Sequence, residues 1–221
     1  SKTVSFALPT EPLLMSVIPL DSSLQGPALS SHLQWEFEQY YPNVSIKDFV
    51  VSAYPIPGPS KGVKQAFLVG VQRGTIAFLK RAAAELRLQV YLIDIEHFSV
   101  EKTLRHCHPE LLKDDILLVG VRGACLDASL VSQGQYVDYR AFTVQHQDDL
   151  KKSIVAYRQY LEQKDGIESF SKILLYGFNV SAQTMSQIQR ETGISTMALD
   201  AMKNLTPSKK LGSRNPSFRI S

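Results

Sequence analysis

The chain has 221 residues, of which 44% are hydrophobic and 20% are charged. This composition is ordinary for a globular protein and leaves room for one large or two modest domains. The net charge of +3 is too small to indicate nucleic-acid binding. No apolar run approaches the roughly 18 residues of a membrane span. Ser1–Leu8 alternates like a strand, so we expect no signal peptide.

Two cysteines, Cys107 and Cys125, lie too far apart for a metal or redox motif. Cys107 is flanked by His106 and His108, but helical residues two positions apart do not face each other. We therefore predict no metal site, no catalytic residue and a reduced, cytoplasmic setting.

The first half of the chain alternates between predicted strands and helices. Pro19 lies within the second extended run, which favours an edge strand there. Ser30 or Ser31 is the expected cap of the first helix. The expected elements, in chain order, are strands at Val4–Leu8 and Leu13–Leu20, a helix at Ala28–Tyr40, strands at Val44–Pro55 and Gln65–Gln72, a helix at Thr75–Leu86, a strand at Gln89–Ile95 and a helix at Glu96–Cys107.

The polar bridge Pro109–Asp115 is the candidate domain boundary. The predicted organisation is a first domain at 1–112, a second domain at 113–206 and a basic tail at 207–221. The tail carries four basic residues and no acid, so it is either a solvated segment or one attracted to anionic lipid or an acidic partner. The expected elements of the second half are three strands within Ile116–Phe142, a helix at Asp148–Gln163, a strand at Ile173–Tyr176, a helix at Ser181–Glu191 that Gly193 ends, and a strand at Ile194–Leu199.

The Ile116–Phe142 meander has a small-residue turn, Arg122-Gly123-Ala124, between its first two strands. Glycine at such a turn lets backbone amides approach an anion. Actin-like ATPases hold nucleotide phosphates at a strand, glycine turn and strand of this kind. The order of three strands followed by alternating helices and strands is typical of ribonuclease H-like domains.

Four segments, in order, carry a specific resemblance: Phe6–Pro9 with Leu14–Leu20, Leu33–Pro42, Leu86–Glu96, and the meander with the helix and strand that follow it. Together they resemble the PilM-like family, actin-like cytoplasmic proteins of type IV pilus assembly that are similar to FtsA. The resemblance implies an α/β, actin-like fold of two ribonuclease H-like domains with mixed sheets. The first domain is expected to be incomplete at its N-terminus, because the family's aspartate-x-glycine-serine hairpin has no counterpart before Val4.

The same resemblance implies a set of nucleotide-binding positions: Glu96, Gly120, Arg122, Gly123, Gly177 and Asn179. Gly120 stands where the family has a metal-facing aspartate, and Gly177-Phe178-Asn179 replaces paired glycines. Glu96 has a second interpretation, a favourable charge in the first turn of its helix. Arg122 either binds a phosphate or fills the position of the missing cation. We therefore favour a degenerate nucleotide cleft and no required cofactor, with ATP and Mg²⁺ left as possible ligands.

The helix at Ala28–Tyr40 and the residue after it hold four large aromatic rings, Trp35, Phe37, Tyr40 and Tyr41. One buried stripe does not hold four such rings, so some are candidate partner-binding residues. By resemblance, the partner is the cytoplasmic tail of a bitopic inner-membrane pilus protein. The expected function is a non-enzymatic scaffold at the inner face of the bacterial inner membrane, peripherally associated through its partners and with possible self-association. The alternatives are an ATP-binding switch of the same machinery and the cytoplasmic domain of a type II secretion protein.

Overall fold

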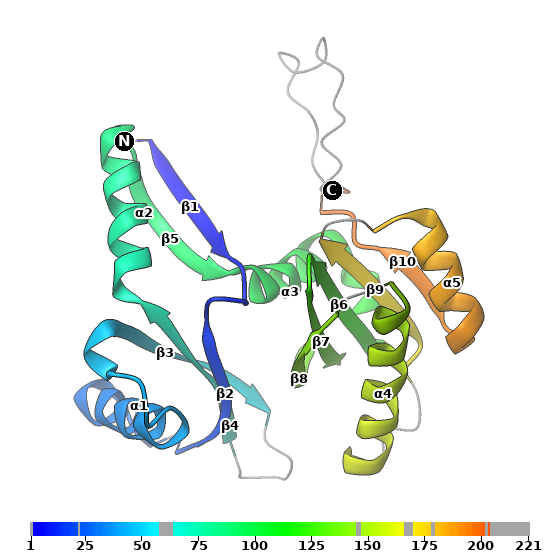
Figure 1. Cartoon of the computed structure of the whole chain (residues 1–221), viewed down its shortest axis with the longest axis horizontal. Coiled ribbons are helices and arrows are strands. Elements are labelled where there is room, and N and C mark those ends of the chain that lie inside the picture. Colours follow the sequence, from blue (N-terminus) through cyan, green and yellow to red (C-terminus); the bar gives the residue numbers. More distant parts are fainter. Residues whose placement is uncertain are drawn as a thin grey trace. The chain divides into compact units, whose positions relative to one another are not determined.

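The structure is a computed structural model that describes residues 2–21, 23–57, 64–144, 147–165, 170–177, 180–201 and 203. The chain forms two compact units, Ser1–Ser99 and Val100–Ser221 (Figure 1). The division lies inside helix α3 (Glu96–Cys107), whereas the sequence placed the boundary after residue 112. The proposed basic tail at 207–221 lies outside the described residues.

The first unit contains two sheets among its described residues. Strands β1 (Thr3–Leu8) and β5 (Gln89–Ile95) form a parallel pair. Strands β2 (Leu14–Leu20), β4 (Lys64–Gln72) and β3 (Phe49–Pro57) form an antiparallel sheet with β4 in the middle. The prediction from Pro19 is confirmed, because β2 is an edge strand. Helix α2 (Arg73–Glu85) connects the two sheets.

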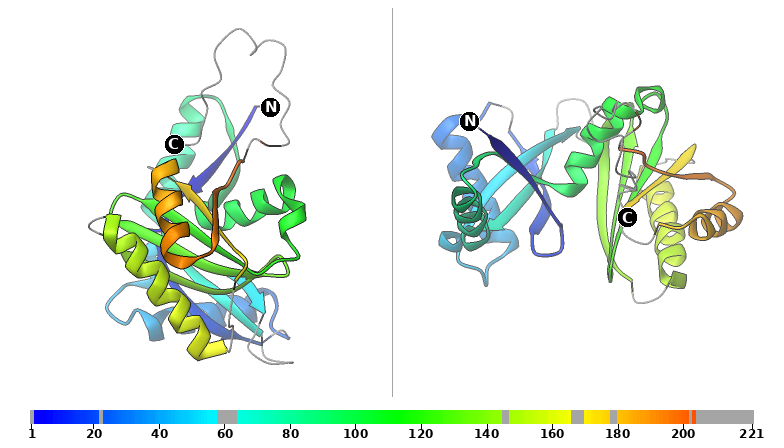
Figure 2. Two further views of the ribbon diagram at one scale, coloured as in Figure 1. Left: turned by 90° about the vertical axis from the view of Figure 1, so that its right-hand side faces the viewer. Right: turned by 90° about the horizontal axis from the view of Figure 1, so that it is seen from above.

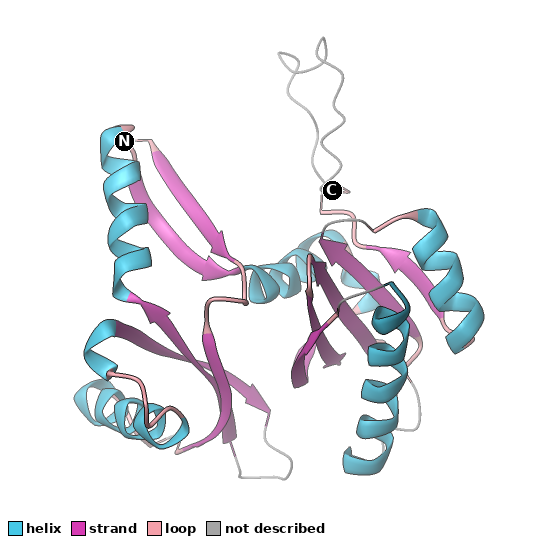
Figure 3. Ribbon diagram, in the orientation of Figure 1, coloured by secondary structure: helices cyan, strands magenta, loops and turns pink. Residues whose placement is uncertain are grey.

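Helix α1 (Gly26–Tyr40) packs against the antiparallel sheet (Figure 3). Leu33 and Phe37 from one face of the helix join Ile18, Phe49 and Leu68 in a shared apolar core. The predicted cap at Ser30 or Ser31 is wrong, since the helix begins at Gly26 with a proline in its first turn. The Ser30 hydroxyl instead donates a hydrogen bond to the carbonyl of Gly26, 3.2 Å away.

The strand predicted at Val44–Pro55 begins later than expected. A short 3-10 helix, η1 (Ile46–Asp48), precedes β3, and β3 continues through Pro57. Residues 58–63, between β3 and β4, lie outside the described part of the chain.

The second unit is built on a five-stranded sheet in the order β10-β9-β6-β7-β8. Its strands are β6 (Ile116–Arg122), β7 (Cys125–Ser132), β8 (Gln135–Thr143), β9 (Lys172–Gly177) and β10 (Ser195–Ala198). The first three form an antiparallel meander, and β9 and β10 add parallel strands beside β6. This is the ribonuclease H-like arrangement that the element order predicted.

Helices α4 (Gln147–Asp165) and α5 (Ala182–Thr192) cover one face of this sheet (Figure 2). Tyr157 and Ile188 from the helices pack on Leu117, Val119 and Leu126 from the strands. Helix α5 ends as predicted at Gly193, whose φ of +70° a glycine adopts without strain.

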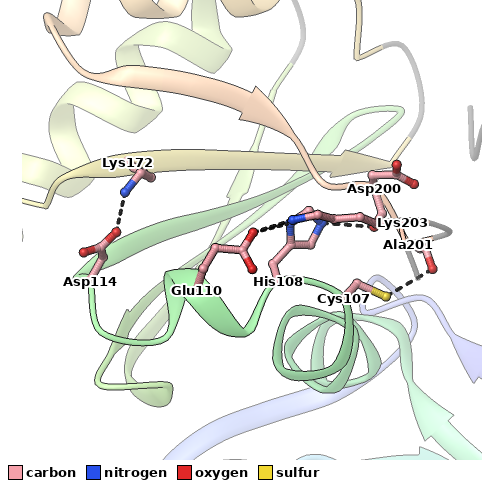
Figure 4. A network of polar contacts seen from close by, with 8 residues as sticks. All are labelled: Cys107, His108, Glu110, Asp114, Lys172, Asp200, Ala201 and Lys203. Carbon is pink, nitrogen blue, oxygen red and sulfur yellow. Dashed lines mark hydrogen bonds and ion pairs between the residues drawn. The ribbon is translucent and has the colours of Figure 1, made fainter.

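The segment after β10 is tied to the end of α3 and to the 3-10 helix η2 (Pro109–Leu111) (Figure 4). The Nε2 of His108 lies 3.0 Å from the carbonyl oxygen of Asp200, and the Cys107 thiol donates to the carbonyl of Ala201 at 3.3 Å. An ion pair between Lys203 and Glu110 adds to these bonds. Sequence-distant parts of the second unit are thereby joined.

Within the described ranges, no helix combines the length and the apolar composition that a membrane span requires.

Candidate functional site

The glycine turn of the meander forms the tip of the β6–β7 hairpin. Arg122 and Cys125 lie opposite each other as the last register pair of the two strands, which leaves Gly123 and Ala124 as the turn. Gly123 has a φ of +49°, as the first residue of a type II′ hairpin turn requires. Nothing lies within 4 Å of the place where its Cβ would be, so the turn is open on that side.

Gly120 lies two residue pairs inside the closing pair of this hairpin, opposite Asp127, and the ring of Tyr176 covers it. The two residues are register partners on the parallel strands β6 and β9. A Cβ built on Gly120 would lie 2.4 Å from the Tyr176 ring, closer than real Cβ contacts come. The position where the resemblance places an aspartate is therefore filled by an aromatic side chain.

Gly177 is the last residue of β9 and lies at the same end of the sheet as the hairpin turn, beside Val121 of β6. Its φ of +102° is a conformation that other residues rarely adopt, and its Cβ would meet the Val121 carbonyl oxygen at 2.2 Å. The structure thus brings Gly120, Arg122, Gly123 and Gly177 to one end of the second unit. Asn179 lies outside the described residues.

Arg122 points into the protein and forms a buried ion pair. Its Nη2 lies 2.8 Å from Oδ2 of Asp127 on the neighbouring strand β7. The hydroxyl of Tyr139 on β8 donates to the other oxygen, Oδ1, at 2.7 Å. Sequence reasoning missed Asp127 and Tyr139 as part of this site. The available signal was a single carboxylate within β7, whose other residues are apolar apart from two serines.

Glu96 lies in the first unit, in the first turn of α3. The preceding carboxylate, Asp94, accepts hydrogen bonds from the Ile95 amide at 2.9 Å and the Ser99 hydroxyl at 3.2 Å. Asp94 therefore ties the end of β5 to α3. No cluster of three or more His, Cys, Asp or Glu side chains with metal-binding geometry occurs in the described ranges.

The four aromatic rings of the α1 region separate into buried and exposed members. Phe37 is fully buried, and Tyr41 is half-buried with its hydroxyl 2.8 Å from that of Ser16. Burial raises the pKa of Tyr41, an effect that the Ser16 hydrogen bond partly offsets. Trp35 is 56% exposed and Tyr40 is 48% exposed. Only these last two rings are available at the surface.

A row of three polar side chains on α1, which the sequence did not indicate, runs beside β2. His32, Glu36 and Tyr40 are spaced four residues apart, so they lie on one side of the helix. His32 Nε2 lies 3.4 Å from the Pro19 carbonyl oxygen, and the Tyr40 hydroxyl donates to the Val17 carbonyl at 3.2 Å. The Glu36 carboxylate lies between them, 3.7 Å from His32 Nε2.

No protein-family model and no curated protein matches the sequence. Solved structures do match the fold. One is described as the PilM-PilN type IV pilus biogenesis complex, with a TM-score of 0.75 and 13% identity, covering 91% of this chain and 70% of that one. Another is a protein of actin-like ATPase fold and unknown function from Bacteroides thetaiotaomicron, with a TM-score of 0.56 and 16% identity, covering 89% and 68%. The chain therefore has an actin-like fold like that of PilM, which confirms the predicted fold class.

Proposed function

We propose that this chain is an actin-like scaffold of type IV pilus assembly that binds the cytoplasmic segment of a membrane partner without needing a nucleotide. The fold's similarity to a solved PilM-PilN complex supports a role in such a machine. In this proposal the protein is cytoplasmic and reaches the inner membrane through its partner. It acts by binding rather than by catalysis.

The buried Arg122–Asp127 ion pair is the observation that supports nucleotide independence. A nucleotide's phosphates need free cations and a Mg²⁺ ion held by carboxylates. Here the arginine of the hairpin is only 7% exposed at its side chain and already neutralises a carboxylate. The Tyr176 ring occupies the space over Gly120. We infer that this end of the hairpin does not fit a Mg²⁺-phosphate group.

The exposed rings Trp35 and Tyr40 are the proposed partner-binding surface. Aromatic side chains are enriched where proteins bind each other, and these two are exposed on the same helix. Both rings project from a helix that Leu33 and Phe37 hold rigidly on the sheet. A rigid support limits the conformational entropy that binding has to remove.

Partner binding is tested with synthetic peptides of the cytoplasmic segments of bitopic inner-membrane proteins from the same pilus machinery. Isothermal titration against the full chain is expected to show one peptide that binds and that Trp35→Ala no longer binds. Phe78→Ala is the matched control, because Phe78 is a 58% exposed aromatic residue of α2 outside the proposed surface. If no segment binds, or if both variants lose binding equally, the proposal is wrong.

Nucleotide independence is tested by titrating the chain with ATP and Mg²⁺. We expect no saturable heat and no change in the peptide affinity when ATP is present. Micromolar ATP binding that Glu96→Ala abolishes would instead establish the ATP-binding switch.

A further inference from the structure

Several hydrogen-bond acceptors lie close together where the row formed by His32, Glu36 and Tyr40 faces β2. The Glu36 carboxylate lies on the same side of α1 as the two side chains that reach the carbonyls of Val17 and Pro19. Each of these carbonyl oxygens has two lone pairs, and a carboxylate can accept about four hydrogen bonds in total. The row is therefore suited to a group that supplies several donors.

Glu36 is the buried charge within the row. Its side chain is 8% exposed, and His32 Nε2 lies 3.7 Å from the carboxylate, beyond hydrogen-bond distance. Within the described ranges, no residue donates a hydrogen bond to this carboxylate. Its oxygens are not among the fully buried side-chain atoms that lack a hydrogen-bond partner in the described ranges, so they keep contact with water. A ligand that carries several donors can therefore reach the carboxylate and replace that water.

Trp35 adds an aromatic face beside the row. Its ring stacks on that of His32, with centroids 6.4 Å apart and an interplanar angle of 23°. The Trp ring is the best side-chain partner for a cation above its face. The charge of the helix agrees with this, because Gly26–Tyr40 contains Glu36 and Glu38 but no Lys or Arg, in a chain of net charge +3.

We propose that the row and Trp35 bind an arginine side chain of the partner's cytoplasmic segment. A guanidinium group carries five donors in a plane, pairs with a carboxylate through two of them and stacks on aromatic rings, which an ammonium group does less well. Segments on the cytoplasmic side of membrane helices are enriched in Lys and Arg. This inference rests on the proposed function for the identity of the partner, whereas the arginine site is defined by residues of this chain alone.

Trp35 reports on the site directly, because it is the one tryptophan of the chain. Its fluorescence is titrated with N-acetyl-arginine amide and, at the same ionic strength, with the uncharged N-acetyl-citrulline amide. We expect a saturable change with arginine and none with citrulline. Glu36→Gln should weaken arginine binding at least about tenfold, since hydrogen bonds to charged groups contribute ~1.5–3 kcal/mol.

Glu38→Gln is the matched control, since Glu38 is an exposed acid two positions along the same helix. It should leave the arginine affinity within about twofold of the wild type, because exposed charges interact weakly in water. An equal response to arginine and citrulline, or an equal loss in both glutamate variants, overturns the arginine site.

Glu36→Gln also separates a binding role from a structural one. Removing a poorly paired buried charge is often neutral or stabilising, so this variant should melt at the wild-type temperature or above it. A large loss of thermal stability would mean that Glu36 holds the fold together, which contradicts the inference.

The partner segment gives the final comparison. A peptide with every Arg and Lys replaced by Gln should lose binding to the full chain. If it binds as well as the native peptide, the arginine site is wrong while the proposed scaffold function stands. If the native peptide itself does not bind, the scaffold function fails, and the titration of Trp35 still decides the arginine site.

Discussion

Arg122 and Asp127 form an ion pair inside the second unit, with Nη2 of the arginine 2.8 Å from Oδ2 of the aspartate. The two residues lie on adjacent strands of the β6–β7 hairpin, close to its glycine turn. The positive charge that the sequence offered as a phosphate ligand thus has an internal counter-charge. This pairing supports the proposal of a scaffold that works without nucleotide.

Arg122→Gln should destabilise the protein strongly. It leaves the Asp127 carboxylate buried without its counter-charge, and removing one partner of a buried pair typically costs about 3–5 kcal/mol. The double variant Arg122→Gln with Asp127→Asn should lose less, because no uncompensated charge remains and an amide oxygen can still accept from Tyr139. Urea denaturation measures the free energy of unfolding of each variant.

The exposed pair Arg158–Glu162 is the control for this prediction, since its side chains are 36% and 38% exposed. Arg158→Gln should cost no more than ~0.5 kcal/mol, as is usual for a helical surface pair. Equal losses at Arg122 and Arg158 would contradict a special role for the buried pair.

Gly120→Asp should not create a working metal-facing carboxylate at this position without a second change. Its Cβ would overlap the Tyr176 ring at 2.4 Å, so the single variant should be destabilised and should not bind Mg²⁺-ATP. Combining it with Tyr176→Ala should recover part of the stability, since the clash disappears and the two effects are not additive. Thermal melting of the two single variants and the double variant measures this coupling.

Gly177→Ala is a matched comparison in which no such rescue is available. The obstacle there is the backbone carbonyl of Val121 at 2.2 Å, together with a φ of +102°. A well-folded Gly177→Ala protein would show that β9 does not approach β6 as described.

Phe37→Ala should mainly lower the free energy of unfolding, whereas Trp35→Ala should mainly abolish partner binding. Phe37 is fully buried beside Phe49 and Tyr41, so its loss should cost about 3–5 kcal/mol of unfolding free energy. Trp35 is 56% exposed, so its removal should cost less than ~1 kcal/mol while abolishing partner binding. Denaturation and peptide titration of the same two proteins give the comparison. Similar stability losses in both would place Trp35 in the core.

Tyr157 should make the second unit sensitive to alkaline pH. Burial, and then the negative charge of Asp138, raise the pKa of Tyr157 well above its usual value of 10.0. Because the folded state holds this proton more tightly than the unfolded state, the associated stability is complete below pH 10 and is lost as the pH rises further. Tyr157→Phe should flatten the decline of stability above pH 10, as followed by circular dichroism.

The same variant should also cost about 1–3 kcal/mol at neutral pH, since it removes the 2.7 Å hydrogen bond from Tyr157 to the buried Asp138 carboxylate. An alkaline profile identical to that of the wild type would show that Tyr157 does not carry this dependence.

The chain order of helices and strands could be predicted because it depends on local patterns. The apolar run at Ile116–Val121 and the glycine turn after it determine a hairpin. Pro19 indicated an edge strand because it has no backbone amide to donate to a neighbour. The same reasoning failed at Ser30 and Ser31, because Pro27 is equally suited to a first helical turn and the helix begins earlier.

The candidate site was only partly predictable. Trp35 and Phe37 are two residues apart on α1, so they point to nearly opposite sides, yet composition alone treats them alike. Which ring is buried depends on how the helix is rotated against the β2-β4-β3 sheet. The burial of Glu36 beside β2 depends on the same rotation, so the sequence alone did not indicate it.

By itself, the sequence determined an α/β order of elements with a glycine turn in mid-chain, because periodicity and turn chemistry act between residues close in the chain. Only the tertiary structure decided what surrounds that turn. Tyr176 reaches Gly120 because β9 pairs with β6, and Asp127 reaches Arg122 because β7 folds back on β6. Strand pairing brings together side chains from separate strands, and local patterns do not specify which of them meet.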